Sequence, residues 1–305
     1  MPAAKRLSPM AEANHISALL KFALGEDRFP IDVGSVAIEV SRHRFPDSPI
    51  AQVQGVDIGG FDGVLKANRD RSKWLIAYSN KVQSEGRKRY TISHEFGHYV
   101  LHRHLQYSFS CSASDIESGD HGQRNIEAEA DRFACNLLMP LDDFRCQTEG
   151  EVIDFDLLGH CADRYGVSLT AAALRWIEIA PERAVLVASR DDHMLWAKSN
   201  DNAFKAGNFF ATRKDTIELP QSALAHSALG SHNTRAQLSP AATWFMHEPD
   251  HVKVVEHVVN ARSYDYQLTL LLMPDADSQY LQHDDGEPEE DTFDRFINNG
   301  QYPVR

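Results

Sequence analysis

The stretch Thr91-Ile-Ser-His-Glu-Phe-Gly-His-Tyr-Val-Leu-His102 decides how the rest of the chain is interpreted. Within it, His94 and His98 stand at positions i and i+4, about one turn of a helix apart. On an α-helix this spacing puts both imidazoles on the same face. Two such nitrogens can share one Zn²⁺ at about 2.0–2.1 Å. The sequence therefore predicts part of a metal site on a helix over residues 90–104.

Glu95 follows the first histidine directly, so its side chain leaves the helix on a slightly rotated face. From there it reaches a water at the metal rather than the metal itself. A carboxylate in this position is the general base of peptidases with the His-Glu-x-x-His motif. We therefore expect Glu95 to be the catalytic residue, taking the proton of the attacking water and passing it to the leaving amine.

A catalytic zinc also needs a third protein ligand and an open position. A second helix, expected over residues 126–138, offers two carboxylates for this role, Glu127 and Glu129. They point about 200° apart on a helix, so only one of them can face the metal. We favour Glu127 because it alone places Asp131 one turn away on its own face. There Asp131 can accept the N–H of a ligand histidine and fix its tautomer.

Other polar residues near the motif have less defined roles. His102 continues the histidine row by one more turn, which places it too far along the helix axis to join the same metal. It is expected to be a partly buried histidine near the end of the helix. The group that stabilises the oxyanion stays open among four residues: Tyr90, Tyr99, His121 and Arg124.

Before and between these helices the chain has a mixed pattern. Residues 11–25 have helical periodicity. Short β-type runs separated by glycines predict a small antiparallel sheet, with strands at Ala51–Val56, Gly63–Leu65 and Trp74–Tyr78. The polar stretch 105–123 is expected to be a loop.

Beyond residue 150 the pattern changes twice. A helical pair is expected at Leu157–Tyr165 and Leu169–Ile177. Strand patterns then return at Ala184–Ser189, Met194–Ala197, Val252–Val259 and Gln267–Met273. We predict an α+β protein with a helix-and-sheet domain, a helical segment, a C-terminal α/β domain and an acidic tail. The predicted boundaries are 10–150, 151–180, 181–283 and 284–305.

Composition narrows the class of protein. The formal net charge is −13, which argues against a broad phosphate-binding surface. The four cysteines contain no Cys-x-x-Cys pair and are expected to be reduced thiols. No stretch approaches the roughly 20 apolar residues of a membrane span, and the N-terminus lacks the apolar core of a signal peptide. We therefore expect a cytoplasmic protein without a membrane partner.

The two helical segments together resemble the ImmA/IrrE metallopeptidase family. The resemblance rests on residues 91–102 and on Ile126-Glu-Ala-Glu-Ala-Asp-Arg-Phe-Ala-Cys-Asn-Leu-Leu-Met-Pro140, with looser similarity over residues 10–180. It implies a minimal zincin fold with a three-stranded sheet packed on the helices. The cofactor it implies is Zn²⁺, although histidine and carboxylate ligands also suit Mn²⁺.

The family's activity is endopeptidase cleavage of a protein. The usual target is a helix-turn-helix repressor of the XRE type, whose cleavage relieves repression of stress-response or mobile-element genes. An edge strand among residues 63–80 is expected to hold the substrate extended. Some members continue with a helix-turn-helix-like part and a GAF-like sensor domain, which residues 155–178 and 182–280 would provide here.

Two other functions fit parts of the sequence. A non-catalytic zincin-fold regulator would bind a repressor or ligand without cutting it, although such a protein has no use for Glu95. A DNA-binding factor would use residues 155–178. That segment mixes two arginines with several acidic residues, a poor balance for phosphate contact. We therefore expect these helices to pack on the peptidase part and expect no direct nucleic-acid binding.

Overall fold

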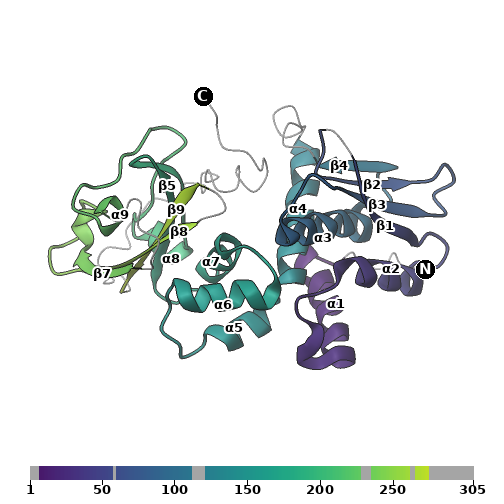
Figure 1. Ribbon diagram of the computed structural model, residues 1–305, viewed down its shortest axis with the longest axis horizontal. Helices are drawn as coiled ribbons and strands as arrows, with labels where there is room; N and C mark the ends of the chain where they lie inside the picture. Colours follow the sequence, from purple (N-terminus) through teal and green to yellow (C-terminus); the bar gives the residue numbers. More distant parts are fainter. Residues whose placement is uncertain (1–6, 58–59, 112–120, 228–234, 262–264, 275–305) are drawn as a thin grey trace. The chain divides into compact units, whose positions relative to one another are not determined.

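Figure 1 shows the computed structural model of the chain, which describes residues 7–57, 60–111, 121–227, 235–261 and 265–274. The chain divides into two compact units, each described by itself below. They are Met1–Gln147 with Ala162–Ser168, and Thr148–Cys161 with Leu169–Arg305. The predicted acidic tail at 284–305 lies outside the described residues. The four predicted boundaries stay predictions.

The first unit contains a four-stranded mixed sheet in the order β1-β3-β2-β4. Its strands are β1 (Ile50–Val56), β2 (Gly63–Ala67), β3 (Trp74–Ser79) and β4 (Ser108–Cys111). β2 pairs antiparallel with β3 and β4, as expected, but β1 runs parallel to β3. β4 is an addition to the predicted sheet, and it lies inside the stretch 105–123 that the sequence predicts as a loop.

This topology corrects the predicted substrate strand. Among the described strands, β2 lies between β3 and β4, and β3 lies between β1 and β2. Neither of the strands within residues 63–80 is therefore an edge strand. The edges are β1 and β4, because the chain crosses over to place β1 beside β3 rather than beside its neighbour in sequence.

Six helices belong wholly or partly to the first unit in the described residues. They are α1 (Pro9–Leu24), α2 (Val33–Arg44), α3 (Glu85–His102), α4 (His121–Leu138), α5 (Leu141–Thr148) and α6 (Phe155–Tyr165). α3 begins before the predicted residue 90 because the Ser84 side chain caps it, accepting a hydrogen bond from the Arg87 backbone. α3 contacts β2, β3 and α4, and Figure 1 shows α4 crossing α3.

A glycine and an alanine set the distance between α3 and α4. Ala130 of α4 is fully buried. A Cβ added at Gly97 of α3 would lie 3.1 Å from Cδ1 of Phe133 and 3.2 Å from Cα of Ala130. The backbones therefore approach closely at this point because neither residue carries a large side chain. This contact lies between the histidine motif on α3 and the acidic run on α4.

A buried ion-pair network anchors α5 in the first unit. Asp143 accepts hydrogen bonds from Arg28 at 2.8 Å, from Arg164 at 2.9 Å and from the Tyr165 hydroxyl at 2.7 Å. The side chains of Arg28 and Asp143 are only 1% and 5% exposed. Burial opposes ionisation of Asp143, but these donors hold its pKa below the usual 3.8. The carboxylate is therefore charged at neutral pH and balances a buried guanidinium.

The second unit is built on a five-stranded antiparallel sheet in the order β6-β5-β9-β8-β7. Its strands are β5 (Arg183–Arg190), β6 (His193–Ser199), β7 (Arg235–Pro240), β8 (Lys253–Ala261) and β9 (Tyr266–Met273). Its helices are α7 (Leu169–Ile177), α8 (Asp201–Lys205) and α9 (Leu224–Ser227). The predicted helical pair matches α6 and α7. β7, α8 and α9 fall in the middle stretch for which the sequence pattern predicts no element.

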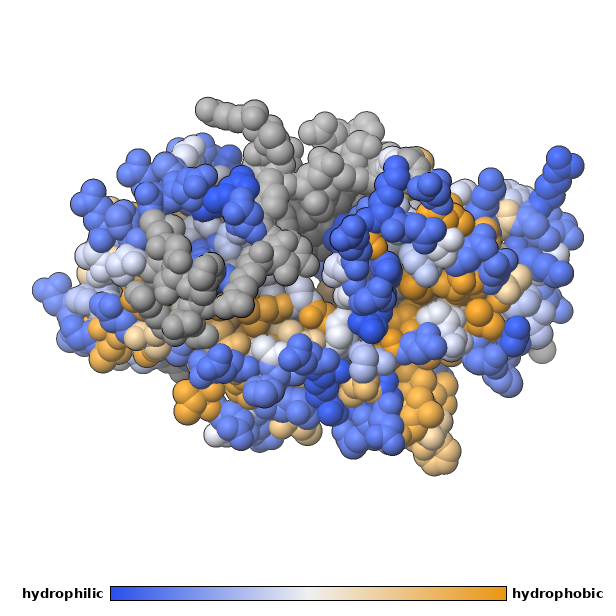
Figure 2. Space-filling model, in the orientation of Figure 1, coloured by the Kyte–Doolittle hydropathy of each residue, from blue (hydrophilic) through white to orange (hydrophobic). Residues whose placement is uncertain are grey.

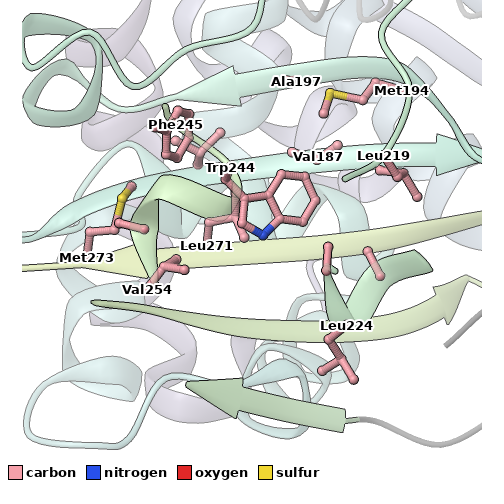
Figure 3. Close-up of a cluster of buried hydrophobic side chains, with 14 of the residues drawn as sticks. Val187, Met194, Ala197, Leu219, Leu224, Trp244, Phe245, Val254, Leu271 and Met273 are labelled. Carbon is pink, nitrogen blue, oxygen red and sulfur yellow. The ribbon is translucent and has the colours of Figure 1, made fainter. Parts of the chain in front are cut away.

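One hydrophobic cluster of the second unit lies on one face of this sheet, and Leu186 and Leu270, which alternate with its members along β5 and β9, are fully buried on the other face. Figure 3 shows Trp244 and Phe245 over the strands, close to Val187, Leu271 and the surrounding apolar side chains. All members of the cluster drawn there are nearly or fully buried. This domain therefore has its own hydrophobic core, which agrees with a C-terminal α/β domain. Its resemblance to a GAF domain stays a prediction.

Apolar surface is exposed around α1 in the first unit. Leu19 is 50% exposed and Phe22 is 94% exposed, and Figure 2 shows orange surface over this helix. Nothing in the described residues covers these side chains. Among the described residues, none of the helices has the length and apolar character that a bilayer span requires.

Candidate metal centre

His94, His98 and Glu127 meet between α3 and α4. The two Nε2 atoms of the histidines are 3.0 Å apart. Oε2 of Glu127 lies 3.1 Å from Nε2 of His94 and 3.3 Å from Nε2 of His98. The structure thus brings the three predicted ligand atoms into one small triangle, with both histidines buried and Glu127 half-buried.

The triangle has the size and chemistry that a zinc ion requires. Ligand atoms of a tetrahedral zinc with bonds of 2.0–2.1 Å lie about 3.3 Å from one another. The Nδ1 atom of His94 faces a carboxylate, so a neutral His94 carries its proton there and presents a lone pair at Nε2. This lone pair and a carboxylate oxygen then point at each other, an arrangement that a cation stabilises. The residues present therefore fit the metal.

Asp131 holds His94 from the side away from the triangle. Its Oδ1 lies 2.7 Å from Nδ1 of His94 and accepts a hydrogen bond from the Tyr90 hydroxyl at 2.5 Å. Burial and the neighbouring Asp131 raise the pKa of Tyr90 well above 10, so its hydroxyl stays protonated and acts as a hydrogen-bond donor. This is the arrangement that the sequence predicts for Asp131, with Tyr90 as an unforeseen third member.

Glu129, the rival ligand, lies elsewhere. Its Oε2 is 2.8 Å from Nε2 of His102, and Nδ1 of His102 is 3.2 Å from Nδ1 of His98. His102 is fully buried, more deeply than the sequence suggests. The ring of Phe109 on β4 stacks on His98 with centroids 4.7 Å apart. The sequence does not point to Phe109, because the pattern of residues 105–123 predicts a loop there.

Two of the four residues that could stabilise the oxyanion have hydrogen-bond partners in the structure. The Tyr90 hydroxyl is engaged by Asp131, and the Tyr99 hydroxyl donates to the backbone carbonyl of Ser48 at 2.9 Å. Neither hydroxyl points into the triangle in this structure. The side chains of His121 and Arg124 lie outside the described part of the chain. The assignment of an oxyanion donor therefore stays open among the four residues.

The ionisation of two triangle members suits metal binding. Burial lowers the pKa of His98 to about 4, so its imidazole is neutral at pH 7. Burial acts to raise the pKa of Glu127, but its contacts with the imidazoles of His94 and His98 outweigh burial and bring the pKa well below 4.5. Neutral imidazole and ionised carboxylate are the forms that coordinate a divalent cation.

Glu95 lies beneath β2. It is fully buried. A Cβ added at Gly63, the first residue of β2, would lie 2.7 Å from Oε1 of Glu95 and 2.5 Å from Cγ2 of Thr91. Any larger residue at this position would therefore force Glu95 or Thr91 to shift, because the strand backbone lies close to the carboxylate of the predicted general base. The only sequence signal for this role was a glycine at the start of a strand.

Replacing Gly63 with alanine is expected to displace Glu95 while leaving the ligand triangle in place. A shift of about 1 Å in a catalytic group can reduce turnover by ~100-fold. We expect a loss of that order in cleavage rate, with zinc affinity unchanged. The control is Gly34→Ala on α2, where the new methyl meets no atom closer than 3.6 Å. Wild-type activity in Gly63→Ala would show that the strand does not position Glu95.

Fold and site together define the class of protein. A His-Glu-x-x-His helix crossed by a second, Glu-bearing helix under a small sheet is a zincin-like metallopeptidase domain. Residues 49–176 match the IrrE N-terminal-like domain family, Peptidase_M78. This chain therefore carries an ImmA/IrrE family domain, which is of the metallopeptidase type.

Two further comparisons bear on the whole chain. No curated protein is significantly similar to it. A solved structure described as a Mycobacterium tuberculosis transcriptional regulator matches 88% of this chain and 81% of its own, with a TM-score of 0.50 and 17% sequence identity. At that identity the match shows a shared fold.

Proposed function

We propose that this protein is a zinc-dependent endopeptidase that hydrolyses a peptide bond in a protein substrate. His94, His98 and Glu127 are its proposed ligands, Asp131 supports His94, and Glu95 is the general base. The observation that carries this proposal is the triangle of ligand atoms 3.0–3.3 Å apart with a buried glutamate next to it in sequence. The family match to a metallopeptidase domain supports it.

The chain's own residues divide the chemistry between them. Zinc, when bound, polarises the scissile carbonyl and lowers the pKa of water toward 7. Glu95 takes the proton of the attacking water and delivers it to the leaving amine. Asp131 keeps the proton of His94 on Nδ1, so that Nε2 stays available to the metal. Gly63 of β2 leaves free the space that the Glu95 carboxylate occupies.

The edge strand β4 offers a place for an extended substrate. It is four residues long, pairs with β2 on one side, and carries Phe109, which stacks on His98. A peptide that paired with its other side would run past the metal centre in an extended conformation. This location replaces the predicted strands within residues 63–80, which are interior to the sheet.

The proposed substrate is a helix-turn-helix repressor of the XRE type, whose cleavage would relieve repression in a stress or mobile-element response. The resemblance to the ImmA/IrrE family supports this choice, and the fold shared with a protein described as a transcriptional regulator agrees with it. Zinc is the proposed metal, and manganese is the alternative that the same ligands suit. The proposed location is the cytoplasm.

The test uses the full chain, zinc, and the helix-turn-helix repressor encoded nearest to its gene. We expect two defined repressor fragments, resolved by gel electrophoresis and mass spectrometry, that do not form after treatment with a chelator. A repressor that binds the zinc-loaded protein and stays intact would instead support a non-catalytic zincin-fold regulator. A repressor cleaved equally well after chelation would exclude the metal mechanism.

A further inference from the structure

His102 is a fully buried polar residue with a contact at each ring nitrogen. Nδ1 lies 3.2 Å from Nδ1 of His98, and Nε2 lies 2.8 Å from Oε2 of Glu129. His102 is on α3, one turn after His98, while Glu129 projects from α4. The three side chains therefore form a continuous row from the metal triangle to the partly exposed Glu129 carboxylate, whose side chain is 36% exposed.

Hydrogen-bond chemistry fixes the proton positions along this row. With a carboxylate oxygen of Glu129 2.8 Å from Nε2 of His102, that nitrogen is the donor, and Nδ1 of an imidazole that carries a single proton is then an acceptor. The facing Nδ1 of His98 must then donate, which leaves the lone pair of His98 on Nε2. That is the nitrogen in the triangle, 3.0 Å from Nε2 of His94. The row thus selects the one tautomer of His98 that can bind a metal.

We propose that Glu129 and His102 form a positioning relay that orients His98 as a metal ligand and fixes its tautomer. The relay deepens the proposed function and rests on it, because it presumes that His98 binds the metal. It has a counterpart at His94, where Asp131 does the same work directly. Each ligand imidazole is then oriented by a carboxylate of α4. Asp131 contacts His94 directly, and Glu129 acts on His98 through His102.

The surroundings of His98 are consistent with such support. The ring of Phe109 stacks on His98 with an interplanar angle of 15°, so it restricts the plane of the imidazole but offers no polar group. His98 is fully buried, so an orienting hydrogen bond has to come from within the protein. His102 supplies it and in turn requires a fixed tautomer, which Glu129 provides.

The experiment measures zinc affinity of the full chain by competition with a chromophoric chelator at one pH. Loss of an outer hydrogen-bond partner of a ligand histidine costs about 10–100-fold in metal affinity. We expect a loss in that range for Glu129→Ala and His102→Phe, and a smaller loss for Glu129→Gln, whose amide oxygen still accepts. Matched controls are Glu85→Gln on the surface of α3 and His43→Gln on α2, which should bind zinc as the wild type does.

A spectroscopic measurement separates the relay from a merely structural role. Long-range ¹H–¹⁵N correlation spectra report which ring nitrogen carries the proton, and we expect Nε2–H for His102 in metal-free and zinc-loaded protein. In Glu129→Ala this preference should weaken. His102→Phe can fail to fold, which circular dichroism would show; the Glu129 variants and the spectra then decide.

The relay and the peptidase proposal fail in different ways. Wild-type zinc affinity in Glu129→Ala, or an Nδ1–H tautomer of His102, would overturn the relay even if the protein cleaves a substrate. Absence of cleavage by a wild-type chain that binds zinc would overturn the peptidase proposal and leave the relay standing. A wild-type chain that binds no zinc would overturn both.

Discussion

Replacing Glu95 with glutamine is expected to reduce cleavage by about 10²–10⁴-fold, the usual contribution of a general acid–base group. The amide has nearly the shape of the carboxylate but cannot take a proton from water. Because Glu95 lies outside the triangle formed by His94, His98 and Glu127, zinc should bind the variant with wild-type affinity. The measurement is the initial rate of fragment formation from the repressor, together with the zinc content of each protein.

Two comparisons make this result specific. Glu85→Gln makes the same chemical change on the surface of α3, where Glu85 pairs with Lys88 at 2.6 Å, and it should leave the rate unchanged. Glu127→Gln should instead weaken zinc binding, because it replaces a proposed ligand. Cleavage by Glu95→Gln at the wild-type rate would remove Glu95 from the mechanism, whatever the zinc content.

Replacing Asp143 with alanine is expected to lower the free energy of unfolding of the first unit by up to about 3–5 kcal/mol, the cost of removing one partner from a buried ion pair, because the one other carboxylate that contacts Arg28 among the described residues is the exposed Glu26 at 3.5 Å. The Arg28 guanidinium, 1% exposed, would lose its hydrogen bond to Asp143 at 2.8 Å. The Tyr165 hydroxyl would lose its acceptor as well. Urea denaturation of the zinc-free chain, followed by far-ultraviolet circular dichroism, measures the change.

The adjacent Asp142 provides the control. Its side chain is 63% exposed and pairs with Lys21 at 3.5 Å, so Asp142→Ala should cost at most about 1 kcal/mol. The pH dependence has a definite sign. Because the folded pKa of Asp143 lies below 3.8, its stabilising contribution is complete above that pH and is lost as the pH falls through the lowered pKa. Equal effects of the two substitutions would contradict this account.

The sequence could predict the members of the triangle because helical periodicity shows which side chains share a face of each helix. His94 and His98 share a face of any regular helix, and the choice of Glu127 over Glu129 follows from the same geometry. The distance between the two helices is a matter of tertiary structure. The small side chain of Ala130 nevertheless indicates a close approach of the two helices, and in the structure Ala130 packs opposite Gly97.

The parts that the sequence could not place depend on contacts between distant segments. Gly63 comes close to Glu95 only in the folded protein, where β2 packs on α3. The parallel pairing of β1 with β3 cannot be predicted from the residues of either strand alone. β4 has a single apolar residue with its neighbours polar, so its four residues look like a loop. The distance argument rightly keeps His102 out of the triangle, but it says nothing about what Glu129 reaches from the other helix.

The triangle also has a topological consequence. His98 and Glu127 are 29 residues apart in the chain, yet their ligand atoms nearly touch. An ion held between them closes a loop in the way that a disulfide does, and closing a loop of about 30 residues by a covalent link restricts the unfolded chain by about 3–4 kcal/mol. Unlike a disulfide, such a cross-link through a metal ion can be removed by a chelator. If zinc binds as proposed, removing it is therefore expected to lower the free energy of unfolding of the α3–α4 pair as well as to stop cleavage.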